Sequence, residues 1–138
     1  MITGIGHVAI RVSDLKRALA FYQGVLGLPE LFRLNHDDGS PWLVYLKVSD
    51  DSFVELFPGG APRPEAQGNP VGYVHLCLHV DDMAKTLADL AEQGVDASKG
   101  PTRGKDGNWQ FWLTDPDGNR IELMQLMPDG LQRQALRR

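Results

Sequence analysis

Apolar and polar residues alternate in a short stretch near the start of the chain. Val8, Ile10 and Val12 alternate with positions that include His7 and Arg11. Successive side chains of a β-strand point to opposite faces, so this pattern predicts a strand with one aliphatic face. The second face of the strand then carries the histidine and the arginine.

The same alternation returns in the middle of the chain, at residues 73–80. One face of this stretch takes His75, Cys77 and His79, and the other takes aliphatic residues. The chain therefore contains two predicted strands in which a histidine lies opposite an aliphatic row.

A helical pattern follows each of these strands. Apolar residues recur at helical spacing over 14–26 and 82–93, each after an aspartate that can cap a helix and before a glycine that can end one. Further strands are expected at 30–34, 42–48, 52–57, 95–99, 109–114 and 119–126. Each half of the chain thus reads β-α-β-β-β, and a repeated unit with one buried face must pack to close a core.

The pattern divides the 138 residues into two modules that together form a single α+β domain over 1–138. The first module covers 4–58 and the second covers 71–127. Residues 59–70, which are rich in proline and glycine, are predicted to link them.

Each module also places a glutamate on its last strand, and the spacing from histidine to glutamate is nearly the same in both. The pairs are His7 with Glu55 and His75 with Glu122. A carboxylate among apolar neighbours is costly to bury unless it is paired or bound to a cation. Imidazole and carboxylate ligands together suit Ni, Co, Zn, Mn or Fe(II), and four such ligands leave coordination positions open for water and substrate. The repeat therefore predicts one divalent metal ion held by all four side chains.

Other residues of ligand type fit simpler roles. Cys77 is expected to be a small buried apolar residue. His36 lies in a polar turn and is expected at the surface, and His79 is expected to line a cavity or face solvent.

Composition narrows the function classes. The net charge of −4 argues against nucleic-acid binding, which needs a basic patch. No stretch of about 18 apolar residues suggests a membrane span, and the start of the chain does not look like a signal peptide. A single cysteine excludes an internal disulfide and suits a reducing compartment, so the cytoplasm is expected.

The chain resembles the vicinal oxygen chelate superfamily, also called the glyoxalase/bleomycin-resistance/dioxygenase family, over residues 4 to 126. The resemblance is carried by these motifs: His-Val-Ala-Ile-Arg-Val-Ser-Asp-Leu from His7, Phe-Tyr-Gln-Gly-Val-Leu-Gly-Leu from Phe21, Val-Glu-Leu around Glu55, His75, and Asp-Pro-Asp-Gly-Asn-Arg-Ile-Glu-Leu from Asp115. It implies that the two βαβββ modules form half-open sheets that enclose a metal site.

The chain order His, Glu, His, Glu is similar to that of glyoxalase I-like (lactoylglutathione lyase-like) proteins. This resemblance implies that Glu122 is the catalytic base and that Glu55 is a ligand and second base. It also implies that Arg11 contacts glutathione. From its place on the face of His7, Arg11 is expected either to bind a substrate carboxylate or to form a salt bridge. Residues expected at the substrate as well are Arg103, Lys105 and the aromatic Trp109.

Three other functions stay open on this scaffold: an epimerase of an acyl thioester, an Fe(II) or Mn(II) dioxygenase, and a non-catalytic protein that binds a drug and confers resistance. The segment 56–60 has no asparagine where glyoxalase I carries one. The co-substrate is therefore expected to be glutathione or another thiol. The resemblance also implies a homodimer that acts on a small molecule.

Overall fold

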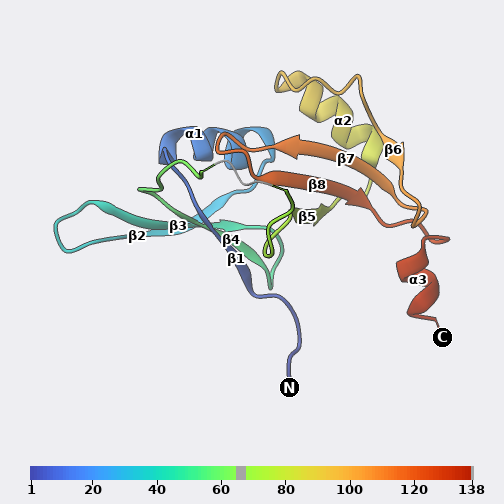
Figure 1. Ribbon diagram of the computed structural model, residues 1–138, viewed down its shortest axis with the longest axis horizontal. Helices are drawn as coiled ribbons and strands as arrows, with labels where there is room; N and C mark the ends of the chain where they lie inside the picture. The colour runs from blue at the N-terminus through green and yellow to red at the C-terminus, as the bar shows by residue number, and fades with distance from the viewer. Residues whose placement is uncertain (65–67, 138) are drawn as a thin grey trace. The chain divides into compact units, whose positions relative to one another are not determined.

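The computed structural model describes residues 1–64 and 68–137 (Figure 1). The chain forms two compact units, Met1–Pro70 and Val71–Arg138. Residues 65–67 of the predicted linker lie outside the described part. Each unit is described by itself.

The first unit contains one four-stranded sheet with the strand order β1-β4-β3-β2. β1 runs parallel to β4, and the other neighbours are antiparallel. Its elements are β1 (His7–Arg11), α1 (Leu15–Leu19), the π-helical turn η1 (Ala20–Val25), β2 (Glu30–Asn35), β3 (Pro41–Lys47) and β4 (Phe53–Phe57).

The second unit repeats this topology, with the strand order β5-β8-β7-β6 and a parallel pair β5–β8. It adds a short helix at its end. Its elements are β5 (Leu76–His79), α2 (Met83–Glu92), β6 (Thr102–Arg103), β7 (Trp109–Thr114), β8 (Arg120–Gln125) and α3 (Leu131–Ala135). The predicted α+β class with a βαβββ pattern in each half is therefore confirmed.

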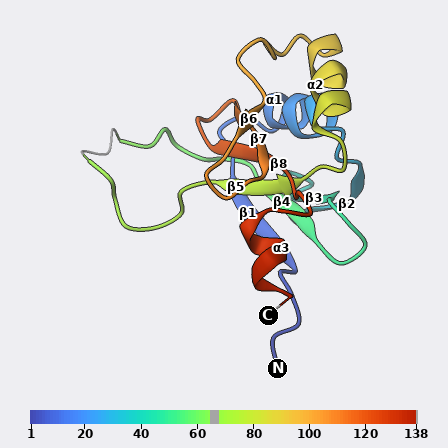
Figure 2. The ribbon, with the colours of Figure 1, turned by 90° about the vertical axis from the view of Figure 1, so that its right-hand side faces the viewer.

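Each unit has a helix on one side of its own sheet, α1 in the first and α2 in the second (Figures 1 and 2). Both helices begin at an aspartate: Asp14 accepts a hydrogen bond from the Arg17 amide, and Asp82 accepts one from the Lys85 amide. Such caps satisfy amides that have no partner within the helix. In the first unit the helix-side core contains Ile10, Val12, Ala18, Tyr22, Val44, Leu46, Val54 and Leu56. In the second unit it contains Leu78, Met83, Leu87, Leu90, Phe111, Leu113, Ile121 and Leu123.

The predicted first helix changes character half-way along. The α-helix ends at Leu19, and η1 continues it with a wider turn in which the Leu26 amide bonds the Phe21 carbonyl. Tyr22 is fully buried in this turn, and Gly27, at φ 69°, ends it. Such wide turns are rare and occur mostly as single turns inside α-helices, so a prediction from α-helical spacing does not include them.

The strand predicted at 95–99 does not form. The Asp96 side chain accepts a hydrogen bond from the Ser98 amide, and the Gly100 amide bonds the Ala97 carbonyl, so local turns take the place of a ladder. The edge strand is instead β6, which pairs with β7 over two residues in a segment for which no strand was predicted. β5 also starts later than predicted, at Leu76.

α3 is held to the loop before β7 by a buried amide. Asn108 donates hydrogen bonds to Asp106 and to Gln132 of α3, and its Oδ1 accepts one from the Met127 amide. Gly130 is required beside it, because a Cβ there would stand 2.2 Å from Asn108 Oδ1. The end of the unit thus carries the helix α3. No helix within residues 1–64 and 68–137 has the length and apolarity needed to cross a bilayer.

Candidate metal centre

The His–Glu pair of the first unit sits on the sheet face opposite α1. β1 and β4 pair in parallel with Ala9 opposite Glu55 and His7 opposite Phe53, so the histidine and the glutamate share that face. His7 Nε2 lies 3.3 Å from Glu55 Oε2. The Glu55 side chain is 10% exposed, whereas that of His7 is 46% exposed.

The second unit places His75 and Glu122 in the same way. Cys77 lies opposite Glu122 in the parallel pair of β5 and β8, and His75 lies two positions before Cys77, just ahead of β5. His75 Nε2 is 3.0 Å from Glu122 Oε2, and Glu122 is buried. In both units, therefore, an imidazole nitrogen meets a buried carboxylate oxygen at an equivalent point of the sheet.

The two nitrogen–oxygen distances are similar to the separation of two ligand atoms on one metal ion. Two ligand atoms that each lie about 2.1 Å from one metal ion, at a right angle, are separated by about 3 Å. The same distances also suit an ion pair between a protonated imidazole and a carboxylate. Within either unit, the described residues include no group of three or more His, Cys, Asp or Glu side chains that could hold a metal ion. Each unit by itself brings together one histidine and one glutamate.

Aromatic rings flank both pairs. Tyr45 of β3 lies opposite Glu55, and the edge of its ring meets the His7 ring at a centroid distance of 5.8 Å. In the second unit Trp112 of β7 lies opposite Glu122, and its ring meets the His75 ring edge-on at 4.8 Å. Each imidazole is therefore positioned by the aromatic side chain on the neighbouring strand.

The groups beside the carboxylates differ in their chemistry. Burial and the charge of the neighbouring Glu55 carboxylate raise the pKa of Tyr45. Burial, together with Glu122, raises the pKa of the Cys77 thiol to about 12, so this thiol stays protonated at neutral pH. His75 Nδ1 is buried and has no hydrogen-bond partner within the described residues.

The predicted substrate residues are spread over both faces of the sheets. Arg11 lies on the Glu55 face, where it donates to the Pro58 carbonyl at 3.3 Å and stacks over the Phe57 ring at 5.3 Å. Lys105 is exposed in the loop between β6 and β7.

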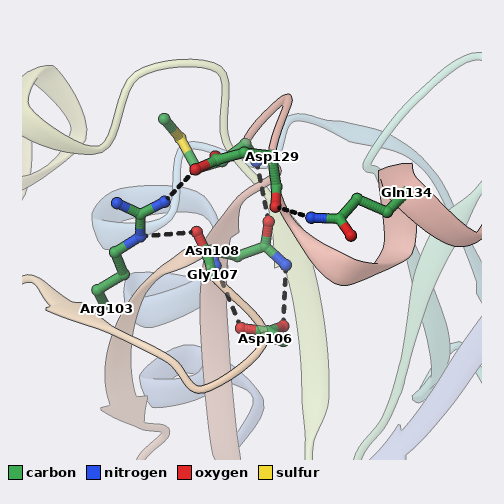
Figure 3. A network of polar contacts seen from close by, with 7 residues as sticks. Arg103, Asp106, Gly107, Asn108, Asp129 and Gln134 are labelled. Carbon is green, nitrogen blue, oxygen red and sulfur yellow. Dashed lines mark hydrogen bonds and ion pairs between the residues drawn. The ribbon is translucent and has the colours of Figure 1, made fainter.

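Arg103 and Trp109 lie on the other side of their sheet. Arg103 pairs with Trp109, and Trp109 in turn pairs with Gln125, whose side chain accepts a hydrogen bond from the first amide of α2. This face is the helix side, opposite Glu122. Arg103 donates to Asp129 and to the Gly107 carbonyl (Figure 3). Their roles at a substrate stay predictions.

Arg120 and Trp112 also lie on the Glu122 face. The guanidinium of Arg120 lies 4.3 Å from the centre of the Trp112 ring, and Trp112 contacts His75. The sequence signal was the period of two along β8, which places Arg120 on the same face as Glu122. His79 is exposed and lines a cavity of about 370 Å³ in the second unit.

Comparison with known families identifies the scaffold. The model of the Glyoxalase/Bleomycin resistance protein/Dioxygenase superfamily matches residues 4–123. The chain belongs to this superfamily. The topology of its two sheets and the placement of a His–Glu pair in each unit agree with that membership.

Individual relatives of this superfamily member differ in what their names say they do. A probable lactoylglutathione lyase from Synechocystis sp. is 31% identical over 123 residues, which cover 86% of this chain and 92% of the relative. A glyoxalase family protein from Enterococcus faecalis has a similar structure, with a TM-score of 0.73 and 26% identity over 88% of this chain and 96% of that one. An antibiotic binding protein from Streptomyces sp. CB03234 is also similar, with a TM-score of 0.69 and 27% identity over 91% of this chain and 98% of that one.

Proposed function

We propose that this protein is a metal-dependent lyase or isomerase of the glyoxalase I type. Its substrate would be the adduct of a 2-oxoaldehyde with a thiol such as glutathione, or a related α-hydroxycarbonyl compound. The observation that carries the proposal is the repeated pair: a buried carboxylate within 3.3 Å of an imidazole nitrogen, at equivalent positions in both units. The relatives named lactoylglutathione lyase support this reaction class.

The proposed metal ligands are His7, Glu55, His75 and Glu122, and the proposed ion is divalent nickel, cobalt, zinc, manganese or iron(II). When bound, the ion would supply Lewis-acid stabilisation of the negative charge that develops on adjacent substrate oxygens. Whether the two pairs come from one chain or from the two chains of a homodimer is left open in this proposal. Light scattering during size-exclusion chromatography tests the dimer, for which we expect twice the 15.3 kDa chain mass.

Proton transfer is assigned to Glu122. Its carboxylate would remove the proton next to the substrate carbonyl and return it to the neighbouring carbon. It is 4% exposed, so it would act in a site with little competing water. Arg11, on the Glu55 face, is proposed to contact an anionic group of the substrate.

The test combines metal content with turnover. The protein is freed of metal, reconstituted with Ni²⁺ or Co²⁺, and assayed optically with the methylglyoxal–glutathione adduct. We expect metal-dependent turnover, and we expect Glu122→Gln to lower kcat by about 100-fold or more, as for loss of a general base. Wild-type protein that binds no divalent metal would refute the proposal.

Two variants of the same residue type provide the matched comparison. His75→Gln removes a proposed ligand and should abolish metal binding. His79→Gln changes an exposed histidine that has no ion pair among the described residues, so it should keep metal binding. Equal metal affinity of the two variants would contradict the assignment of His75.

A binding function is the second candidate, favoured by the similarity to the antibiotic binding protein. Exposed aromatic residues Phe32 and Trp42 on the first unit could contact an apolar drug. Tight drug binding by a well-folded protein that takes up no metal would favour this function.

Turnover that continues without oxygen would exclude a dioxygenase.

A further inference from the structure

The cavity of about 370 Å³ in the second unit lies where β5 ends and the chain turns toward α2. The parallel pairing of β5 and β8 continues to its edge, since the Val80 amide donates to the Met124 carbonyl at 2.9 Å. Ligand pockets in proteins commonly have volumes of about 300–1,000 Å³, so this cavity has room for a small molecule. All of its lining residues belong to the second unit: His79, Val80, Asp81, Gln125, Leu126 and Arg133.

Two of the lining side chains have hydrogen-bonding groups that the protein itself does not use. Within residues 1–64 and 68–137, neither the His79 imidazole nor the Arg133 guanidinium makes a hydrogen bond or an ion pair. By contrast, Arg103 in the same unit is paired with Asp129. A guanidinium presents its N–H donors in a planar fork that matches the two oxygens of a carboxylate. The cavity therefore leaves such a fork available to a ligand.

The backbone that carries Arg133 is held in place by the residues before it in α3. The Leu131 amide donates to the Asp106 carbonyl at 2.8 Å. Gln132 accepts a hydrogen bond from Asn108 at 2.6 Å and donates one to Asp106 Oδ2 at 2.8 Å. Because this turn of helix is already ordered, a ligand that binds Arg133 has to order only the side chain, which lowers the entropic cost of binding.

A negative charge and an oriented amide also line the cavity. Gln125 Oε1 accepts a hydrogen bond from the Met83 amide at 2.9 Å, which leaves the Nε2 group of Gln125 as a donor. Asp81 contributes a carboxylate. Groups of both signs in one cavity suit a ligand that itself carries both charges, and the carboxylate disfavours a ligand with several negative charges.

From this lining we infer that the cavity is a binding site for a small zwitterion of the amino acid or peptide class. The ligand's carboxylate pairs with Arg133, and its ammonium group pairs with Asp81. His79 and the Gln125 amide offer further hydrogen bonds. None of these side chains is a proposed metal ligand, so the inference does not rest on the proposed function.

Three peptide probes test the two charges separately. Glycylglycine carries both charges, glycylglycinamide lacks the carboxylate, and acetylglycylglycine lacks the ammonium group. Each is titrated into the full chain, and binding is followed by NMR at the backbone amides of His79, Val80 and Asp81 and at the side-chain N–H of Arg133. We expect glycylglycine to bind with a Kd of about 1 mM. Glycylglycinamide should bind about 10-fold more weakly, and acetylglycylglycine about 3-fold more weakly because the Asp81 pair is exposed.

Two substitutions assign these preferences to side chains. Arg133→Gln should remove the preference for glycylglycine over glycylglycinamide, because the amide group cannot pair with a carboxylate as an ion. Asp81→Asn should remove the preference for glycylglycine over acetylglycylglycine. Arg137→Gln is the matched control: it changes an exposed arginine that follows α3 and does not line the cavity, so all three affinities should stay at the wild-type values.

Several results would overturn the inference. One is equal binding of glycylglycine and glycylglycinamide by the wild type, and another is an equal loss of affinity in Arg133→Gln and Arg137→Gln. A third is the absence of any shift in the cavity signals at glycylglycine concentrations about 20-fold above the expected Kd. Inorganic phosphate that shifts the same signals with the affinity of glycylglycine would also overturn it, since the cavity would then bind anions without regard to an ammonium group.

Discussion

Replacing Asn108 with leucine should loosen the end of the second unit, because this amide joins α3 to the loop before β7 (Figure 3). Asn108 is fully buried. Its Nδ2 donates to Asp106 Oδ2 at 2.8 Å and to Gln132 Oε1 at 2.6 Å, and its Oδ1 accepts from the Met127 amide at 2.9 Å. Leucine has a similar volume, so the substitution removes three hydrogen bonds without opening a large cavity.

The cost follows from what each partner loses. The Met127 amide is left without its acceptor in a part-buried place, which costs about 1–3 kcal/mol. The bond to the Asp106 carboxylate involves a charged group, and such bonds contribute about 1.5–3 kcal/mol. Gln132 reaches solvent and recovers most of its bond there. After allowance for the gain from burying leucine, we expect the free energy of unfolding to fall by about 3 kcal/mol.

Urea denaturation followed by circular dichroism and tryptophan fluorescence measures this loss. The control is Gln132→Ala, which removes one exposed partner of the same amide and should change the free energy of unfolding by about 0.5 kcal/mol or less. Hydrogen exchange should show the amides of α3 losing protection in Asn108→Leu before those of β7 and β8. A free energy of unfolding for Asn108→Leu within about 0.5 kcal/mol of the wild-type value would show that the Asn108 amide does not hold α3 to the loop before β7.

Two further predictions concern stability. The buried Asp115 side chain accepts hydrogen bonds from the Asn119 amide and from Asn119 Nδ2, both at 2.8 Å. Asp115→Ala should therefore lower the free energy of unfolding, measured in urea, by about 2–3 kcal/mol. A loss below about 0.5 kcal/mol would show that these hydrogen bonds do not stabilise the turn. Hydrogen bonds from Gln132 and Asn108 hold the pKa of Asp106 below its usual value, so this carboxylate stabilises the fold above about pH 4, and that contribution is lost as the pH falls through the lowered folded-state pKa. Between pH 6 and about pH 2, the free energy of unfolding should fall by less in Gln132→Ala than in the wild type. Equal falls would argue against the stabilisation of the Asp106 carboxylate by Gln132.

The sequence predicted the faces of the sheets better than their edges. Alternation alone placed His7 and Arg11 on one face of β1, and the register with β4 agrees. This prediction was possible because side chains alternate between the two faces of any strand, whatever the strand packs against. At the edge, β6 is two residues long and has no apolar period, so a local turn at Asp96 and Ser98 and a short ladder at Thr102 could not be told apart in advance.

Contacts that depend on register across strands were also beyond the sequence. Tyr45 gave no signal as a partner of Glu55, because its place opposite the carboxylate depends on where the β3–β4 hairpin turns. Trp109 and Trp112 looked alike as strand aromatics, yet they lie on opposite faces, and only Trp112 shares the face of Glu122. A single residue of register decides which of two such rings lies beside the carboxylate.

The repeat itself explains where chemical differences must be sought. Two modules with the same strand order and the same parallel pairing place their glutamates in the same local backbone geometry, so the backbone cannot give the two carboxylates different roles. The proposed reaction assigns proton transfer to only one of them, Glu122. The difference must therefore come from side chains that touch the carboxylates, and across the adjacent strand these are Tyr45 in one unit and Trp112 in the other.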